Sequence, residues 1–395
     1  MIRSAAAKAG KLLAPMAPDA LISQARRLAR LEDFGEQAFD QPLARLCRGL
    51  DEEARLSSLG RIAARKDIVR MLANRLQIID WRKHHPEAAG RPVARPLFIV
   101  GLPRTGTTIL HNLMAQDPDS RCPLSWEVMY PAPPPETASF ETDKRIARAE
   151  RDMKWLNRLA PDFRRIHPVA ARLPQECISI TAHEFMSMQF PTMYRLPGYY
   201  GWLDGADKAP AYRFHKIFLQ HLQARHAGKR WVLKAPGHLD ALDALLAVYP
   251  DARIVQTHRE PLDVVASLAS LIVTLHRAFS TRVEPHEIGP DTTRRWEAAA
   301  EKAMADRDRM GNDSSRFLDI AYSDLIAEPI ATVAGIYRHF DMPLTPLAKQ
   351  RMADFLAANP KDKHGRHRYD LADFGLTREE ERQRFARYRE RYLAA

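Results

Sequence analysis

Residues 96–108 read PLFIVGLPRTGTT, the segment of the chain with the clearest local pattern. The apolar run at 97–100 predicts a short buried strand, and the residues after it form a Gly-x-x-x-x-Gly turn. The pattern TTILHNLM at 107–114 predicts a helix whose first free N–H groups point at that turn. A strand, a glycine turn and a helix N-terminus in this order predict a backbone cradle for an anionic group.

The cradle lacks the lysine of a nucleotide-triphosphatase loop. Gly106 is followed by Thr107 and Thr108, and the cation of the loop is Arg104 instead. The hydroxyls of Thr105, Thr107 and Thr108 add hydrogen-bond donors. We find no clear magnesium-binding Asp after a strand, so we expect no metal. A planar guanidinium suits a group with several oxygens and less charge than a phosphoryl group, such as sulfuryl.

A second anion motif follows about 150 residues later, in RIVQTHREPLDVVASL at 253–268. Arg259 comes at the end of a predicted strand, and Ser267 lies about two turns into a helix that begins at Pro261. Both side chains can reach one anion over the start of that helix. A helix cap with an ordinary buried serine is the alternative interpretation of the same residues.

Short apolar runs recur along the chain at 231–234, 253–258 and 317–322, and amphipathic stretches separate them. This alternation predicts an α/β fold, with a P-loop-like parallel sheet flanked by helices in three layers. Apolar residues at helical spacing predict that residues 1–95 form an N-terminal helical extension, which leaves 96–395 as the α/β domain. The extension packs on the core or on a second copy of the chain, so a homodimer stays open.

The composition is that of an ordinary globular protein, with 395 residues of which 45% are hydrophobic and 28% charged. The three cysteines lie far apart and show no disulfide or zinc spacing, which favours a reducing compartment. No signal peptide or transmembrane segment is predicted, so we expect a cytoplasmic protein. The formal net charge of +11 fits an anionic ligand as well as solvated basic helices, and we expect no nucleic-acid partner.

The two anion motifs resemble those of a known enzyme family. PLFIVGLPRTGTT is similar to the 5′-phosphosulfate loop of sulfotransferases that use 3′-phosphoadenosine 5′-phosphosulfate (PAPS), and RIVQTHREPLDVVASL is similar to their 3′-phosphate motif. The wider resemblance is to the bacterial-type, third sulfotransferase family, over about 30–393. It includes DPDSRCPLSWEVMYPAPPPE (117–136), RLPQECISI (172–180), WVLKAPGHL (231–239) and HGRHRYDLADFGL (364–376). The resemblance implies PAPS as the donor, no metal, and a small-molecule acceptor.

A weaker similarity to tyrosylprotein sulfotransferases implies a catalytic set. It assigns the role of general base to Glu127 in LSWE, and it aims Arg104 and Lys234 at the bridging oxygen of the leaving group. His238, four residues after Lys234, is the reserve base. A loop glutamate and a strand-end salt bridge are the structural alternatives for Glu127 and Lys234.

Further nucleotide contacts are implied near the C-terminus. Tyr322 in IAYSDL resembles a family tyrosine close to the nucleotide, although a core tyrosine fits the sequence nearly as well. The basic loop KDKHGRHRYD at 361–370 contains Gly365, Arg366 and His367, and it can fold over the 3′-phosphate. A solvated basic loop ahead of a terminal helix is the competing interpretation.

The leading hypothesis is therefore a PAPS-dependent sulfotransferase acting on a hydroxyl or amine. The aromatic and methionine residues between 130 and 202 favour an apolar acceptor, although a protein core has the same composition. A P-loop-type small-molecule kinase is the first alternative, and it would need a lysine beside Gly106 and a magnesium-binding Asp. A non-catalytic nucleotide-binding module is the second, and Arg104, Glu127 and Lys234 argue against it.

Overall fold

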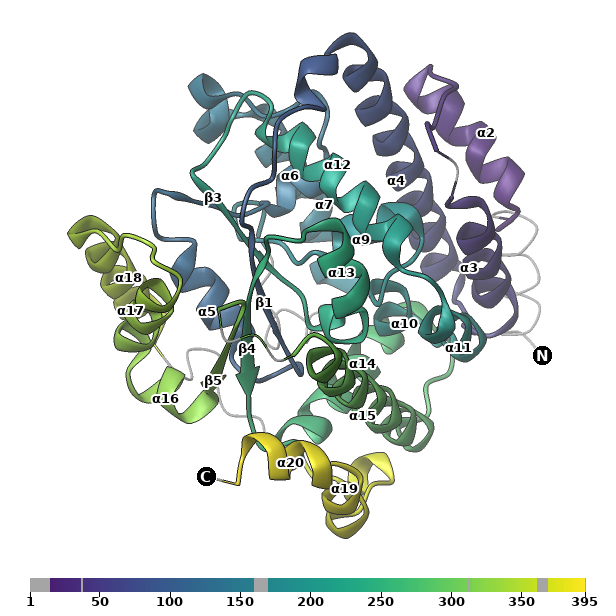
Figure 1. The fold of residues 1–395 in the computed structure, drawn as a ribbon. Helices are drawn as coiled ribbons and strands as arrows, with labels where there is room; N and C mark the ends of the chain where they lie inside the picture. Colours follow the sequence, from purple (N-terminus) through teal and green to yellow (C-terminus); the bar gives the residue numbers. More distant parts are fainter. Residues whose placement is uncertain are drawn as a thin grey trace.

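The structure is a computed structural model that describes residues 15–36, 38–159, 170–311, 313, 315–360 and 369–394. Its centre is a parallel sheet of five strands in the order β2–β3–β1–β4–β5 (Figure 1). The strands are β1 (Leu97–Gly101), β2 (Ser120–Arg121), β3 (Arg230–Lys234), β4 (Arg253–His258) and β5 (Phe317–Ala321). The four predicted strands are confirmed, and β2 was missed because two residues carry no recognisable pattern.

Helices cover both faces of this sheet (Figure 1). Among the described residues they are α2 (Pro18–Ala29), α3 (Asp40–Glu52), α4 (Ser58–His84), α5 (Thr107–Met114), α6 (Ser125–Met129), α7 (Lys144–Leu159), α9 (Ile178–Thr181), α10 (Gln189–Met193), α11 (Pro197–Gly205), α12 (Ala209–Gln223), α13 (Leu242–Val248), α14 (Leu262–Phe279), α15 (Pro285–Arg309), α16 (Tyr322–Ala327), α17 (Pro329–His339), α18 (Pro346–Ala358), α19 (Arg378–Arg384) and α20 (Ala386–Tyr392).

Alternate residues of β1 face two separate hydrophobic cores. Phe98 and Val100 belong to the larger core, together with residues of α4, α12 and α14. Leu97 and Ile99 belong to the smaller core, together with residues of α5, α17 and α18. A strand whose successive side chains are buried on opposite faces must lie between two helical layers. The predicted three-layer α/β fold is therefore confirmed.

The strand order creates a switch point at β1. From β1 the chain moves to β2 and β3 on one side, then crosses to β4 and β5 on the other. β1 pairs with β3 through Leu97 and Val232, and with β4 through Leu97 and Arg253. In open α/β sheets, ligands bind beyond the carboxyl ends of the strands at such a point. The predicted anion loop follows β1 directly.

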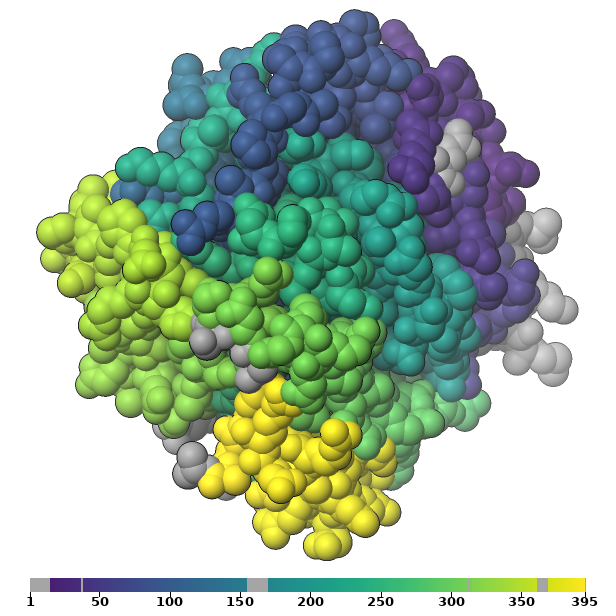
Figure 2. Space-filling model, in the orientation of Figure 1, coloured from purple at the N-terminus to yellow at the C-terminus, as the bar shows by residue number. Residues whose placement is uncertain are grey.

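The N-terminal helices α2, α3 and α4 lie on one side of the molecule, away from the C-terminal helices (Figures 1 and 2). Their buried side chains join the larger core rather than forming a core of their own. α4 also comes very close to the end of α14, because a Cβ on Gly60 would lie 2.0 Å from the carbonyl oxygen of Phe279. The domain boundary at residue 95 stays a prediction, but the extension is packed tightly on the α/β layers.

Candidate active site

A cavity of about 600 Å³ lies beyond the carboxyl ends of the central strands. One wall is formed by residues 103–109 without Thr105, together with Arg259 and Tyr322. The opposite wall is apolar and comes from several helices. The cavity therefore joins the predicted anion loop to a chamber for a second molecule.

The anion loop has the backbone conformation that its glycines predict. Gly101 has φ +148°, and a Cβ there would lie 2.5 Å from Thr257 Oγ1. Gly106 has φ +91°, and a Cβ there would lie 2.8 Å from a methyl carbon of Leu325. Arg104 is also left-handed, with φ 67°, a conformation that costs a non-glycine residue about 1–2 kcal/mol. α5 begins at Thr107, so its unpaired N–H groups face the loop.

Only two of the three loop threonines face the cavity. Thr107 and Thr108 line it. Thr105 is fully buried, and its hydroxyl donates to the carbonyl oxygen of Leu102 at 2.6 Å and lies 2.7 Å from Thr257 Oγ1. The structure does not support the predicted contact of the Thr105 hydroxyl with the anion, because that hydroxyl ties the loop to β4.

Two arginines meet at the rim of the loop. Arg259 donates from Nη1 to the carbonyl oxygen of Arg104 at 3.1 Å, and its guanidinium carbon lies 4.3 Å from the centroid of the Tyr322 ring. Desolvation and the nearby charge of Arg259 both lower the pKa of the Arg104 guanidinium. An anion bound between two like charges relieves their repulsion. Arg104, Arg259 and Tyr322, predicted from distant parts of the sequence, are brought to one place.

Four further nucleotide contacts were predicted, at Ser267 and in the basic loop near the C-terminus. Ser267 lies on the second turn of α14, is 8% exposed, and is not one of the cavity-lining residues. Gly365, Arg366 and His367 lie outside the described residues. The contacts of these four residues with the 3′-phosphate stay predictions.

Lys234 lies behind the loop at the end of β3. Its side chain is 2% exposed, and its Nζ donates to Thr108 Oγ1 at 3.3 Å and to the carboxylate of Glu176. Glu176 and Thr108 both line the cavity, whereas Lys234 lies just outside its wall. The N–H of Cys177 donates to the carbonyl oxygen of Lys234 at 2.9 Å, which holds the Glu176 segment against β3.

Glu176 is a carboxylate of the cavity that our sequence reasoning missed. The side chain is 14% exposed and faces the same space as the anion loop. Its segment, RLPQECISI at 172–180, carried the family resemblance, but no residue of it received a role. The sequence signal for Glu176 was its position inside that motif. The spacing of residues along the chain did not indicate that its carboxylate contacts Lys234.

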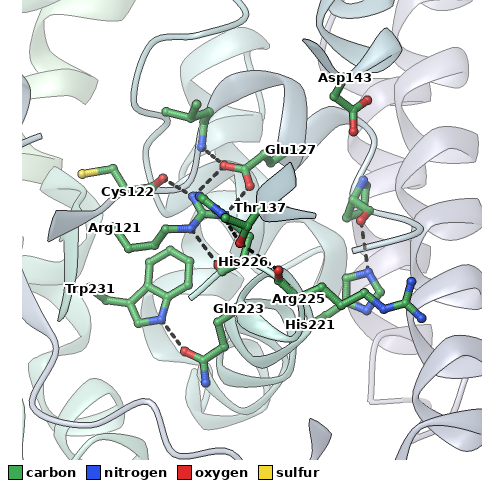
Figure 3. Close-up of polar contacts among 12 residues, drawn as sticks. Arg121, Cys122, Glu127, Thr137, Asp143, His221, Gln223, Arg225, His226 and Trp231 are labelled. Carbon is green, nitrogen blue, oxygen red and sulfur yellow. Dashed lines mark hydrogen bonds and ion pairs between the residues drawn. The ribbon is translucent and has the colours of Figure 1, made fainter. Parts of the chain in front are cut away.

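Glu127, the predicted base, is buried elsewhere (Figure 3). Its side chain is 0% exposed and is not part of the cavity wall. Oε2 accepts from Arg121 Nη1 at 2.9 Å and from the N–H of Leu124 at 2.8 Å, and Oε1 accepts from Arg121 Nη2. The structure does not support the role of base for Glu127, because this carboxylate is bonded to a buried arginine and is not among the residues that line the cavity.

The partner of Glu127 is held equally firmly. Arg121 also donates to the carbonyl oxygen of Cys122 at 2.8 Å, and its guanidinium carbon lies 5.2 Å from the Phe140 ring centroid and 5.0 Å from that of Trp231. A guanidinium with a bidentate carboxylate and two aromatic neighbours is a structural unit. It ties β2 to α6.

The reserve base His238 is also outside the cavity wall. It is 1% exposed, and its Nδ1 lies 2.6 Å from the hydroxyl oxygen of Tyr212. Burial, with smaller contributions from His215 and Lys234, holds the pKa of His238 well below its usual range. His238 is therefore a neutral core histidine, and the structure does not support its reserve role.

The far wall of the cavity is mostly apolar, with polar residues that include Asp67, Gln175, Gln189 and Thr192. Its apolar side chains are Met71 of α4, Val128 and Met129 of α6, Met153 of α7, Met188, Met193 and Tyr194 around α10, and Leu268, Leu271, Ile272, Leu275 and Phe279 of α14. Of the aromatic and methionine residues between 130 and 202 that favoured an apolar acceptor, Tyr130, Met188, Met193 and Tyr194 line the cavity, whereas Phe185, Met186, Phe190, Tyr199, Tyr200 and Trp202 do not. The contribution of α4 was not predicted, because the extension was expected to pack rather than to line the site.

α14 is rich in apolar residues. In the part of the chain that the structure describes, it is the one helix long and apolar enough to span a membrane, and 67% of it is buried inside the protein. Its burial and its cavity-lining leucines account for that apolar character without a membrane. The same described ranges contain no group of three or more His, Cys, Asp or Glu residues that could hold a metal ion.

A family model and two solved structures indicate the same protein family. The family model described as "Sulfotransferase family" matches residues 96–346. The crystal structure of the sulfotransferase STF1 from Mycobacterium tuberculosis H37Rv superposes with a TM-score of 0.83 at 36% identity, over 93% of this chain and 98% of STF1. The crystal structure of STF9 from Mycobacterium avium superposes with a TM-score of 0.84 at 28% identity, over 95% and 97% of the two chains.

A curated relative carries a more specific name. The omega-hydroxy-beta-dihydromenaquinone-9 sulfotransferase Stf3 of Mycobacterium bovis is 27% identical over 274 residues, which is 66% of each chain. The match thus spans just under two thirds of the length of this relative.

Proposed function

Because this chain belongs to the sulfotransferase family, we propose that it transfers a sulfuryl group from PAPS to a hydroxyl or amine of an apolar small molecule. The observation that carries the proposal is a single cavity that joins the anion loop and its two arginines to an apolar chamber. A donor bound at the loop and an acceptor in the chamber would meet at Thr108 and Glu176. The alternative of a small-molecule kinase is not favoured, because the loop has no lysine.

The two ends of the donor have separate sites in this proposal. The phosphosulfate lies in the loop, where it accepts from the N–H groups at the start of α5 and from the hydroxyls of Thr107 and Thr108. The 3′-phosphate lies beside Arg259, and the Tyr322 ring supports that guanidinium from the other side. Arg104 stands between the two sites because Arg259 bonds to its carbonyl oxygen.

Glu176 replaces Glu127 as the proposed general base. The acceptor O–H or N–H gives its proton to the Glu176 carboxylate while its heteroatom attacks sulfur in line. The bond between sulfur and the bridging oxygen breaks, and adenosine 3′,5′-bisphosphate leaves with the extra negative charge. Lys234 bonds to both Glu176 and Thr108, so it orients the base and adds positive charge behind the loop.

An apolar acceptor fits both the wall and a relative. The name of Stf3 records a hydroxylated dihydromenaquinone as its acceptor, which is a largely apolar molecule with one reacting hydroxyl. The methionines and leucines of the chamber supply apolar surface and few polar partners. We also propose a cytoplasmic location, which the three buried free cysteines support.

Donor binding should not need a metal. We expect adenosine 3′,5′-bisphosphate to bind the metal-free protein about 10–100-fold more tightly than ATP with magnesium, because only the bisphosphate offers a group to Arg259. Isothermal titration calorimetry measures both affinities, with a chelator present for the bisphosphate and with magnesium present for ATP. Tighter binding of ATP with magnesium would favour the kinase alternative.

Arg259 should discriminate between nucleotides. Arg259→Ala is expected to weaken adenosine 3′,5′-bisphosphate about 10–100-fold, since a charge-assisted hydrogen bond is lost, and to change adenosine 5′-phosphosulfate much less. Arg225→Ala removes an exposed arginine paired with Glu136 and is the matched control. Equal losses for both nucleotides would show that Arg259 supports the loop and does not contact the 3′-phosphate.

A further inference from the structure

We infer that the apolar end of the cavity opens onto a lipid-docking face, and that an anionic bilayer delivers the acceptor there. The docking face consists of Leu59, Ile62 and Lys66 on α4 and Arg148 and Arg151 on α7. The inference rests on the proposed function only in its choice of an apolar acceptor. Binding of the face to lipid can be measured without any sulfuryl transfer.

The first observation is one stripe along α4. Leu59, Ala63, Lys66 and Arg70 follow one another at steps of four, three and four residues, which places them on one side of the helix. Ala63, Lys66 and Arg70 line the cavity. Leu59 continues the same stripe one turn beyond the wall, so the cavity wall and the outer surface are continuous.

The second observation is the exposure of that end of α4. The side chains of Leu59 and Ile62 are 39% and 54% exposed. In the described ranges, only Leu28 and Leu347 are other large apolar residues with comparable exposure. Neighbouring exposed apolar side chains beside an opening are typical of an interaction site.

The third observation locates the opening itself. Lys66 lines the cavity although its side chain is 68% exposed, and its Nζ lies 3.6 Å from Asp152 Oδ1 on α7. Asp152 also lines the cavity and accepts from the Tyr130 hydroxyl. An ion pair between a solvent-exposed lysine and a wall residue marks the rim, so α4 and α7 flank the mouth.

The positive charge of the rim favours an anionic partner. On α7, Arg148 and Arg151 are exposed, and the Arg148 guanidinium carbon lies 3.9 Å from the centroid of the cavity-lining Tyr130. The acidic rim residues Asp67 and Asp152 are paired with Arg70 and Lys66. Apolar side chains beside exposed basic ones are the composition that binds an anionic lipid surface. A second copy of this chain fits less well, because two such basic faces, on a protein of net charge +11, would repel each other.

The experiment measures sedimentation of the full chain with vesicles, in the absence of donor and acceptor. We expect binding to phosphatidylcholine vesicles containing one third phosphatidylglycerol, and much weaker binding to pure phosphatidylcholine. The double substitution Leu59→Ser with Ile62→Ser should lower the partition coefficient roughly 10–100-fold, because it removes both apolar side chains from the lipid. Leu347→Ser on α18, with 53% exposure, is the matched control and should bind like the parent.

Two further measurements complete the test, one of the preference for anionic vesicles and one of turnover. Arg148→Glu with Arg151→Glu should abolish the preference for anionic vesicles while leaving turnover of a short water-soluble alcohol unchanged. Vesicle binding that is absent in the parent, or equal in the parent and the Leu59/Ile62 variant, overturns the inference. A parent dimer in sedimentation velocity that dissociates in the same variant also overturns it, since the face would then be a subunit interface. If the parent binds vesicles but transfers no sulfuryl group, the proposed function fails and the docking face stands.

Discussion

Replacing Glu176 by Gln should lower kcat by about 10²–10⁴-fold, the usual contribution of a general base. Gln has the size of Glu and still offers Lys234 a carbonyl oxygen, so the packing around Thr108 should survive. It cannot take a proton from the acceptor. Rapid-quench measurement with bound PAPS isolates the chemical step from donor binding and product release.

The pH dependence gives this prediction a second readout. A carboxylate base works only when it is ionised, so the rate of the parent should fall as the pH is lowered and the carboxylate is protonated. The variant should lack that acidic limb. Glu141→Gln removes an exposed carboxylate paired with Arg172 and is the control for general charge effects. Normal turnover of Glu176→Gln, with its acidic limb intact, would show that the base is another group.

Replacing Glu127 by Gln should instead destabilise the fold, by about 3–5 kcal/mol in the free energy of unfolding. The neutral amide leaves the buried guanidinium of Arg121 without a counter-charge, and removing one partner of a buried pair costs that much. Denaturant titration followed by circular dichroism measures the change. Turnover per folded molecule should stay near that of the parent, because Glu127 is not part of the cavity wall.

Two further variants make the Glu127 prediction specific. Arg121→Met combined with Glu127→Gln removes the isolated charge and should recover part of the lost stability. Glu284→Gln breaks an exposed pair with Arg282 and should leave the stability close to that of the parent. A loss below 1 kcal/mol in Glu127→Gln, or a large loss of turnover in its folded form, would return Glu127 to consideration as a catalytic residue.

The sequence suggested Glu127 as the general base. In these two predictions Glu176 has that role, and Glu127 has a structural role. Glu127 follows the first helix of the α/β domain in the same way as the base of distant sulfotransferases, which is why it was predicted. Its position also lies six residues after Arg121, whose side chain is buried. A buried cation needs a carboxylate more than a solvated one does, and Glu127 meets that need.

Four of the five strands and the anion loop were predictable from the sequence, whereas the two-residue strand β2 was not. PLFIVGLPRTGTT specifies a strand, a turn and a helix start through local terms: apolar residues for burial, and glycines where the backbone φ is positive. The strands at 231–234, 253–258 and 317–322 were equally readable, because each is a short apolar run. Arg104 and Arg259 followed from their places in these motifs, at the ends of adjacent strands of a parallel sheet.

Only the tertiary structure decided which side chains face the cavity. Thr105 and Thr107 are two residues apart in the same loop, yet one is buried against Thr257 and the other lines the site. Glu176 meets Lys234 across 58 residues of sequence, and α4 reaches the acceptor wall because Gly60 lets it approach Phe279. Local patterns specify backbone conformation, whereas the partner of a polar side chain depends on which distant segments burial brings beside it.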